Sequence, residues 1–137
     1  MAFKSTVRKP ANSYSQVQAT TAGPGRRVVM MYDGILKNLR AGKALMADKR
    51  PENIETIHNH LQLAERLILE LQLALDHDNG GQLATTLDGL YSFWISHISD
   101  ANMHKDPEML REIISMVKDL RDAWNEAARK ARQQGIT

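Results

Sequence analysis

A chain of 137 residues is long enough to bury one hydrophobic core, and nothing in its length requires a second domain. Because it contains no cysteine, the sequence excludes a disulfide framework, a thiolate nucleophile and a cysteine-rich zinc site. Its 18 basic and 16 acidic residues give a formal net charge of +2, which is too balanced to predict nucleic-acid binding by the whole domain.

Residues 1–23 are rich in Ser, Thr, Ala and Asn and show no sustained period, which predicts a mobile N-terminal arm. Tyr14 and Val17 are isolated apolar side chains within this polar segment. The sequence has no apolar signal core and no run of about 20 apolar residues. We therefore expect a cytoplasmic protein without membrane insertion.

Two helices are predicted in the first half of the chain after the arm. Pro24 suits a first helical residue because its missing N–H would have no partner there. A second helix is expected to open at Pro51. The apolar residues that define the first helix, to about Ala47, are Val28, Tyr32, Ile35, Leu39 and Met46, and those of the second are Ile54, Ile57, Leu61, Ala64, Ile68, Leu71 and Leu75.

The second helix carries more leucine than one neighbouring helix can cover. Leu69 and Leu73 lie on one flank of its apolar stripe, and Leu63 and Leu67 lie on the other. Its C-terminal half is therefore apolar over most of its circumference. Either the helix is central in a bundle, or part of its surface binds a partner.

Two more helices follow a predicted stop at residues 76–81, where glycine can adopt the left-handed conformation that ends a helix. Asp106 and Pro107 are expected to open the last helix. The apolar positions of the third helix are Leu83, Leu87, Leu90, Trp94 and Ile98, with Tyr91, Phe93 and Ile95 to the sides; those of the fourth are Leu110, Ile113, Val117, Leu120, Trp124 and Ala127. The pattern predicts an all-α, antiparallel up-down four-helix bundle at residues 24–132, with a C-terminal tail at 133–137.

No motif in the sequence predicts catalysis, a metal or a cofactor. His58 and His60 are two residues apart and so point about 200° apart on a helix, which prevents them from sharing one ion. His97 is expected to be a hydrogen-bonded, half-buried residue. The calcium-loop pattern that starts at Asp76 fails because Leu87 occupies the place of its closing glutamate. We therefore expect a protein-binding bundle that is not an enzyme.

Several short motifs resemble the flagellar export chaperone family, FliS. They run in the family's order and spacing over residues 12–128, and the Tyr-Asp-Gly and Gly-Gly elements together are more specific than either alone. The motifs are Asn12 to Val17, Thr21 to Pro24, Met31 to Gly34, Leu75-Asp76 with Asn79 to Gly81, Leu87 to Tyr91, Asp100 to Asn102 with Asp106, and Asp119 to Arg121 with Ala123-Trp124. Gly23 and Arg27 depart from the family pattern, which usually has Ser and Leu there.

The resemblance implies a cytoplasmic chaperone that binds the disordered C-terminal segment of flagellin, prevents premature polymerisation and presents flagellin to the flagellar type III export gate. No nucleic acid is expected as a partner. The client-binding or gating residues that we predict are Tyr14, Val17, Met31, Tyr32, Asp33, Gly34, Leu69 and Leu73. Two other classes remain open from the residues alone: a histidine phosphotransfer module, and a helical domain that binds nucleic acid through its basic ends.

Overall fold

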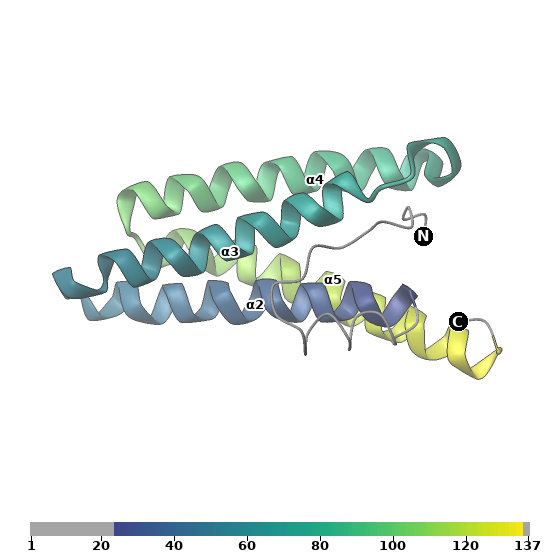
Figure 1. Ribbon diagram of the computed structural model, residues 1–137, viewed down its shortest axis with the longest axis horizontal. Helices are drawn as coiled ribbons and strands as arrows, with labels where there is room; N and C mark the ends of the chain where they lie inside the picture. The colour runs from purple at the N-terminus through teal and green to yellow at the C-terminus, as the bar shows by residue number, and fades with distance from the viewer. Residues whose placement is uncertain (1–23, 136–137) are drawn as a thin grey trace.

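The computed structural model describes residues 24–135, and throughout this range the chain is helical apart from short connections. The elements are α2 (Pro24–Asp48), the 3-10 turn η1 (Pro51–Asn53), α3 (Ile54–Leu73), α4 (His77–His104) and α5 (Glu108–Gln133). Figure 1 shows the four long helices side by side, each running opposite to the one before it. The predicted antiparallel four-helix bundle is confirmed.

The helices form a ring in which α2 packs against α3 and α5, and α4 packs against the same two. The α4–α5 contact is the smallest of these four. Figure 1 shows the reason, because the start of α4 and the C-terminal half of α5 diverge toward one end of the molecule. The bundle is therefore closed at the end where α2 meets α3 and opens at the other.

The connection between α3 and α4 differs from the prediction. We expected the glycines near position 80 to end the second helix, but α3 ends at Leu73. The Asp76 carboxylate accepts hydrogen bonds from the amides of Asp78 and Asn79, both at 3.2 Å, and starts α4 at His77. Gly81, with a φ of 54°, then kinks the first turn of α4. This segment is a helix cap followed by a kink, since a side-chain oxygen satisfies the free amides before the glycine is reached.

The last helix begins one residue later than predicted, at Glu108. Its cap is confirmed, because Asp106 Oδ1 accepts a hydrogen bond of 3.0 Å from the Glu108 amide. The helix-forming signals at Pro24 and at Pro51 also hold, although Pro51 opens a 3-10 turn before the α-helix begins at Ile54.

The core follows the predicted stripes in the middle of each helix and departs from them at the ends. Ile54, Leu83 and Ala127 are exposed, although the sequence pattern placed them in the stripes. Ala128 is buried in place of Ala127 and faces Gly25 of α2. Tyr91, which we placed to the side, is fully buried. The largest fully buried side chains are Trp94, Tyr32, Tyr91, Ile35, Leu39, Leu61, Ile68, Leu71, Leu75, Ile98, Leu110 and Ile113.

Glycine brings α2 close to α3 at two levels. A Cβ added at Gly34 would lie 3.0 Å from Leu67 Cδ1, and one added at Gly42 would lie 2.9 Å from Leu61 Cδ2. Real Cβ atoms rarely approach other atoms so closely, so the leucines of α3 fill the space that a side chain on α2 would need. The sequence analysis gave Gly34 as a client-binding or gating residue and did not single out Gly42.

Gly42 and Gly89 offer a matched pair of substitutions in helix interiors. We expect Gly89→Ala to raise the free energy of unfolding by about 0.5–1 kcal/mol, because no atom lies near its added Cβ. Gly42→Ala has the same gain in propensity but overpacks fully buried Leu61, at a cost of about 1–3 kcal/mol. In chemical denaturation Gly42→Ala should be at least about 1 kcal/mol less stable than Gly89→Ala. Equal stabilities would contradict the close contact.

Candidate protein-binding surface

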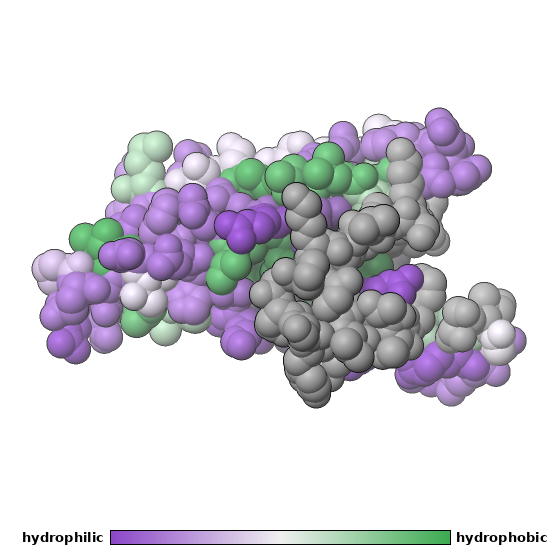
Figure 2. All heavy atoms as spheres, in the orientation of Figure 1, coloured by the Kyte–Doolittle hydropathy of each residue, from purple (hydrophilic) through white to green (hydrophobic). Residues whose placement is uncertain are grey.

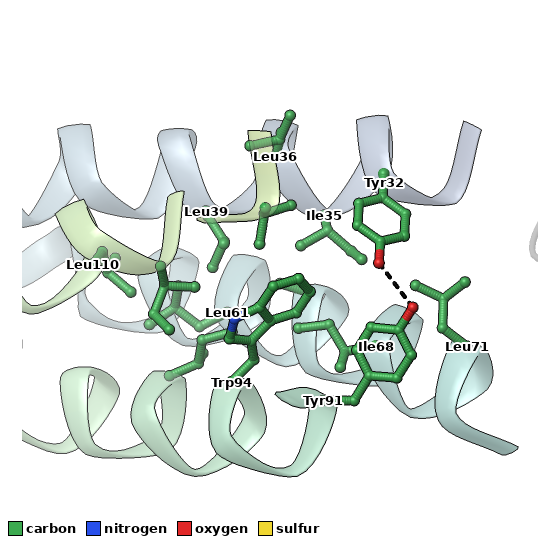
Figure 3. Close-up of a cluster of buried hydrophobic side chains, with 14 of the residues drawn as sticks. Tyr32, Ile35, Leu36, Leu39, Leu61, Ile68, Leu71, Tyr91, Trp94 and Leu110 are labelled. Carbon is green, nitrogen blue, oxygen red and sulfur yellow. Dashed lines mark hydrogen bonds between the residues drawn. The ribbon is translucent and has the colours of Figure 1, made fainter. Parts of the chain in front are cut away.

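Tyr32 of α2 and Tyr91 of α4 meet in the centre of the bundle. Their hydroxyl oxygens are 2.7 Å apart and hydrogen-bonded, and neither side chain is exposed (Figure 3). Burial raises the pKa of both phenols, and hydrogen bonds with Tyr91 and Trp124 partly oppose the rise for Tyr32. Both hydroxyls therefore stay protonated. The pair joins the two helices that lie diagonally across the ring.

An aromatic cluster surrounds this hydroxyl pair. The Trp94 ring lies 5.5 Å from the Tyr91 ring and 6.2 Å from the Tyr32 ring, between centroids. Trp124 of α5 packs edge-on to Tyr32 at 6.5 Å. Tilted and edge-to-face contacts of this kind are favourable for aromatic rings. Trp94 is buried, as its place in the apolar stripe predicts, whereas Trp124 is only partly buried.

Asp33, the next residue along α2, points to a different helix. Its Oδ1 accepts a hydrogen bond of 2.7 Å from Arg121 Nε of α5, and both side chains are more than a third exposed. This bond is the main cause of the raised pKa of Arg121. Because solvent screens the pair, its contribution to stability is small. Its geometric effect is to set the position of α2 along α5.

Residues 32–34 therefore contact three different helices in succession. Tyr32 bonds to α4, Asp33 pairs with α5, and Gly34 faces Leu67 of α3. Met31 is half-buried and packs against the core. A step of about 100° per residue explains how neighbours in sequence reach different sides of one helix. The structure thus places this motif in contacts within the bundle, and direct contact with a client stays a prediction for these residues.

Leu69 and Leu73 lie one turn apart on the surface of α3. Their side chains are 44% and 70% exposed. Leu63, on the other flank, is also exposed, whereas Leu67 is half-buried against Gly34. Figure 2 shows hydrophobic residues gathered in a band over α3 and α4. As the sequence predicted, the bundle leaves part of the leucine-rich surface of α3 in solvent.

A second group of exposed apolar side chains lies on α4 and was missed as a site. Leu83 and Phe93 are both nearly half exposed. Phe93 stacks on the ring of His97 with centroids 5.6 Å apart, and His97 Nε2 donates to the Met109 carbonyl oxygen at 2.8 Å. These contacts fix the exposed ring beside the first turn of α5. Periodicity placed Phe93 beside the core, and it did not indicate that nearly half of the side chain is exposed.

His58 and His60 bond to asparagines of neighbouring helices. His60 Nδ1 is 2.9 Å from Asn38 Oδ1, and His58 Nδ1 is 2.9 Å from Asn102 Nδ2. The prediction that His58 and His60 do not share an ion fits this geometry, and the described residues hold no group of three potential metal ligands. In this part of the chain no helix is long and apolar enough to span a bilayer.

Several sequence predictions fall at or beyond the ends of the described range. Tyr14 and Val17, together with the departure at Gly23, lie outside residues 24–135. Arg27, the other departure, is half-exposed on the first turns of α2. In the C-terminal tail, α5 continues to Gln133, and residues 136–137 lie outside the description.

A bundle whose polar groups bind one another, and whose exposed apolar side chains gather on two helices, belongs to the class of helical protein-binding modules. Comparison with known proteins gives the family. The model of the family described as "Flagellar protein FliS" matches residues 7–131, and the chain belongs to this family.

Three relatives show how evenly the similarity spreads along the chain. The flagellar secretion chaperone FliS of Vibrio cholerae serotype O1 is 33% identical over 124 residues, which cover 88% of this chain and 89% of that protein. The protein of the same name in Campylobacter jejuni is 34% identical over 84% of this chain and 88% of its own. That of Bacillus subtilis is 30% identical over 93% of this chain and 92% of its own.

The buried hydroxyl pair can be tested with three variants. Tyr32→Phe and Tyr91→Phe each leave the other hydroxyl without this partner in a dry core, which should cost about 1–3 kcal/mol. The double variant removes both hydroxyls, so its loss should be smaller than the sum of the single losses. Urea unfolding of all four proteins measures this coupling. Strictly additive losses would contradict a hydrogen bond between the two tyrosines.

Proposed function

We propose that this protein is a cytoplasmic export chaperone that binds the disordered C-terminal segment of flagellin. In this proposal it prevents premature polymerisation and delivers flagellin to the gate of the flagellar type III export apparatus. Family membership supports the role, because the relatives named above are flagellar secretion chaperones. The observation that carries the binding step is the exposure of Leu69 and Leu73, one turn apart on α3.

The exposed side chains suit a client that becomes helical on binding. Two leucines four residues apart present one apolar ridge, and a second amphipathic helix can pack its own ridge beside it. Leu83 and Phe93 of α4 are further apolar side chains that the bundle leaves nearly half exposed. A segment that is disordered alone could follow these patches over a large surface. The proposal requires no catalytic group, so we propose a binding protein and no enzyme.

The energetics favour reversible binding. Covering the exposed half of a leucine or phenylalanine contributes about 1 kcal/mol, so five such side chains contribute about 5 kcal/mol. Ordering a disordered segment costs about 2–5 kcal/mol or more. The chaperone surface therefore roughly offsets the ordering cost, and the client's own apolar face supplies the net affinity. The five side chains are Leu63, Leu69, Leu73, Leu83 and Phe93.

Calorimetry with a C-terminal flagellin peptide tests the binding step. We expect binding with a gain of helix in circular dichroism beyond the sum of the separate spectra. Replacing both Leu69 and Leu73 with Ala should weaken binding about tenfold or more, since truncating central apolar contacts commonly costs over 1 kcal/mol each. Met103→Ala is the control, because Met103 is 75% exposed and lies at the C-terminal end of α4. No binding at high micromolar peptide would contradict the proposal.

The predicted arm gives a separate test. We propose that Tyr14 and Val17 cover part of the apolar surface until a client displaces them, since a tyrosine combines a large apolar ring with a hydroxyl that stays hydrated. Deleting residues 1–19 should then raise the binding of a hydrophobic dye and leave client affinity equal or higher. If the deletion changes neither dye binding nor delivery of the client for export, the arm has no such role.

A further inference from the structure

A shallow pocket lies between the C-terminal half of α2 and the start of α5. Arg40, Lys43, Ala44 and Ala47 line it from α2, and Pro107 and Ile114 line it from the other side. We call it the α2–α5 groove. It lies at the closed end of the bundle, opposite the end where α3 finishes with exposed Leu73 (Figure 1). Leu69 and Leu73, the leucines on which the proposed client binding rests, therefore lie away from this groove.

Three acids on α2 and α5 are paired with cations of α5. Asp33 pairs with Arg121, and Asp122 pairs with Lys118 and Arg121. Hydrogen bonds from Arg121 and Lys118 accordingly lower the pKa of Asp122. Glu108, which lines the pocket, pairs with Arg111. The acid that lines the groove therefore already has a cation of its own helix as its partner.

Three cations in the C-terminal half of α2 form no such pair in the part of the chain that the structure describes. Lys37, Arg40 and Lys43 are spaced three residues apart, and α2 has no acidic residue between Asp33 and Asp48. Within residues 24–135 none of the three forms a salt bridge. The groove side of the bundle consequently carries an unbalanced charge on α2, next to the positive end of the α5 dipole.

The floor of the groove is apolar and made of small side chains. Ala44 and Ala47 lie one turn apart on α2 and face half-buried Ile114 across the groove. Small residues allow the backbone of a second helix to approach closely, and cations at the rim favour acidic side chains on that helix. Shape and charge together fit an amphipathic helix that has small apolar residues on one face and carboxylates beside them.

The spacing of the cations separates this partner from other anions. Residues three apart are displaced by about 60° around a helix, so Lys37, Arg40 and Lys43 spiral around α2 and share no plane. A flat lipid surface would meet only part of this spiral. Nucleic acid favours aromatic side chains among the cations, and the groove has none. A helix that crosses α2 obliquely can contact all three.

We propose that the α2–α5 groove docks an acidic amphipathic helix of a partner protein while the client surface on α3 and α4 stays free. The bound helix places its carboxylates beside Lys37, Arg40 and Lys43 and its small apolar residues over Ala44 and Ala47. Because the groove lies away from Leu69 and Leu73, we expect the chaperone to hold a client and this second partner together.

A synthetic helical peptide of about 15 residues built from Ala, Leu and Glu serves as the probe, with a version that has Gln at every Glu as its control. Fluorescence anisotropy should show binding of the acidic peptide that weakens as salt is raised, and little binding of the neutral one. Amide NMR shifts should concentrate at Arg40, Lys43, Ala44 and Ile114. Equal affinity for both peptides, or shifts spread over all basic residues, would overturn the proposal.

Charge reversal at the groove provides the matched comparison. The double variant Arg40→Glu and Lys43→Glu should lose affinity for the acidic peptide at least about tenfold. Arg66→Glu with Lys130→Glu changes the net charge equally at two exposed cations elsewhere and should lose less than about twofold. Ala44→Trp fills the groove without changing charge and should also weaken binding. Equal losses in the two charge-reversed proteins would show attraction to net charge alone and would overturn the site.

Two further measurements separate this proposal from its alternatives. Anionic lipid vesicles and a short DNA duplex should not show binding that depends on Arg40 and Lys43. If either of them binds in this way while the acidic peptide does not bind, the proposal of an acidic helix as the partner is wrong. The flagellin peptide should bind the groove variants with unchanged affinity. If binding of the flagellin peptide is lost in the Leu69 and Leu73 variants, or is absent in every variant, that result bears on the proposed function. It does not affect the test of the groove, which uses the acidic peptide.

Discussion

The arrangement of the bundle depends on the hydrogen bond between the Tyr32 and Tyr91 hydroxyls in its centre. Apolar packing alone tolerates small rotations of one helix against another, because dispersion contacts are not directional. A buried hydroxyl pair is directional, and separating it leaves two polar groups in a dry core. With Tyr32 fixed toward α4, the helical step sends Asp33 toward α5 and Gly34 toward α3. One short motif therefore sets the rotation of α2 relative to every other helix.

Most of the fold could be predicted from the sequence, because helical periodicity and end signals are local properties. Neighbouring residues in the sequence were enough to predict the apolar stripe around Leu61 and Ile68 and the helix starts at Pro24 and Asp106. The end of α3 was predicted wrongly because two signals compete there, and the Asp76 cap precedes the glycines. The burial of Ala128 in place of Ala127 depends on the path of α5 near Gly25, which no local pattern contains.

The residues of the candidate site were likewise predictable where a local pattern sufficed and were missed where contacts between distant segments decide. Leu69 and Leu73 could be found from the excess of leucine on one helix, since their exposure follows from there being too few neighbours to cover it. Phe93 was missed because periodicity places it beside the apolar stripe and does not tell how much of it a neighbouring helix covers. The partner of Asp33 lies 88 residues away at Arg121, and that distance hides the pairing from periodicity. A family motif marks important residues, but the three-dimensional contacts determine whether they face a client or the bundle.

The two glycine contacts between α2 and α3 have a mechanical consequence. Gly34 meets Leu67 and Gly42 meets Leu61, so the leucine of one level cannot enter the space of the next without meeting a side chain of α2. Sliding of one helix along its neighbour is a common route by which packed helices transmit a binding event. Here these contacts oppose such a shift. Ligands at the two ends of the bundle should therefore bind with additive free energies, and the molecule acts as a rigid connector between whatever each end holds.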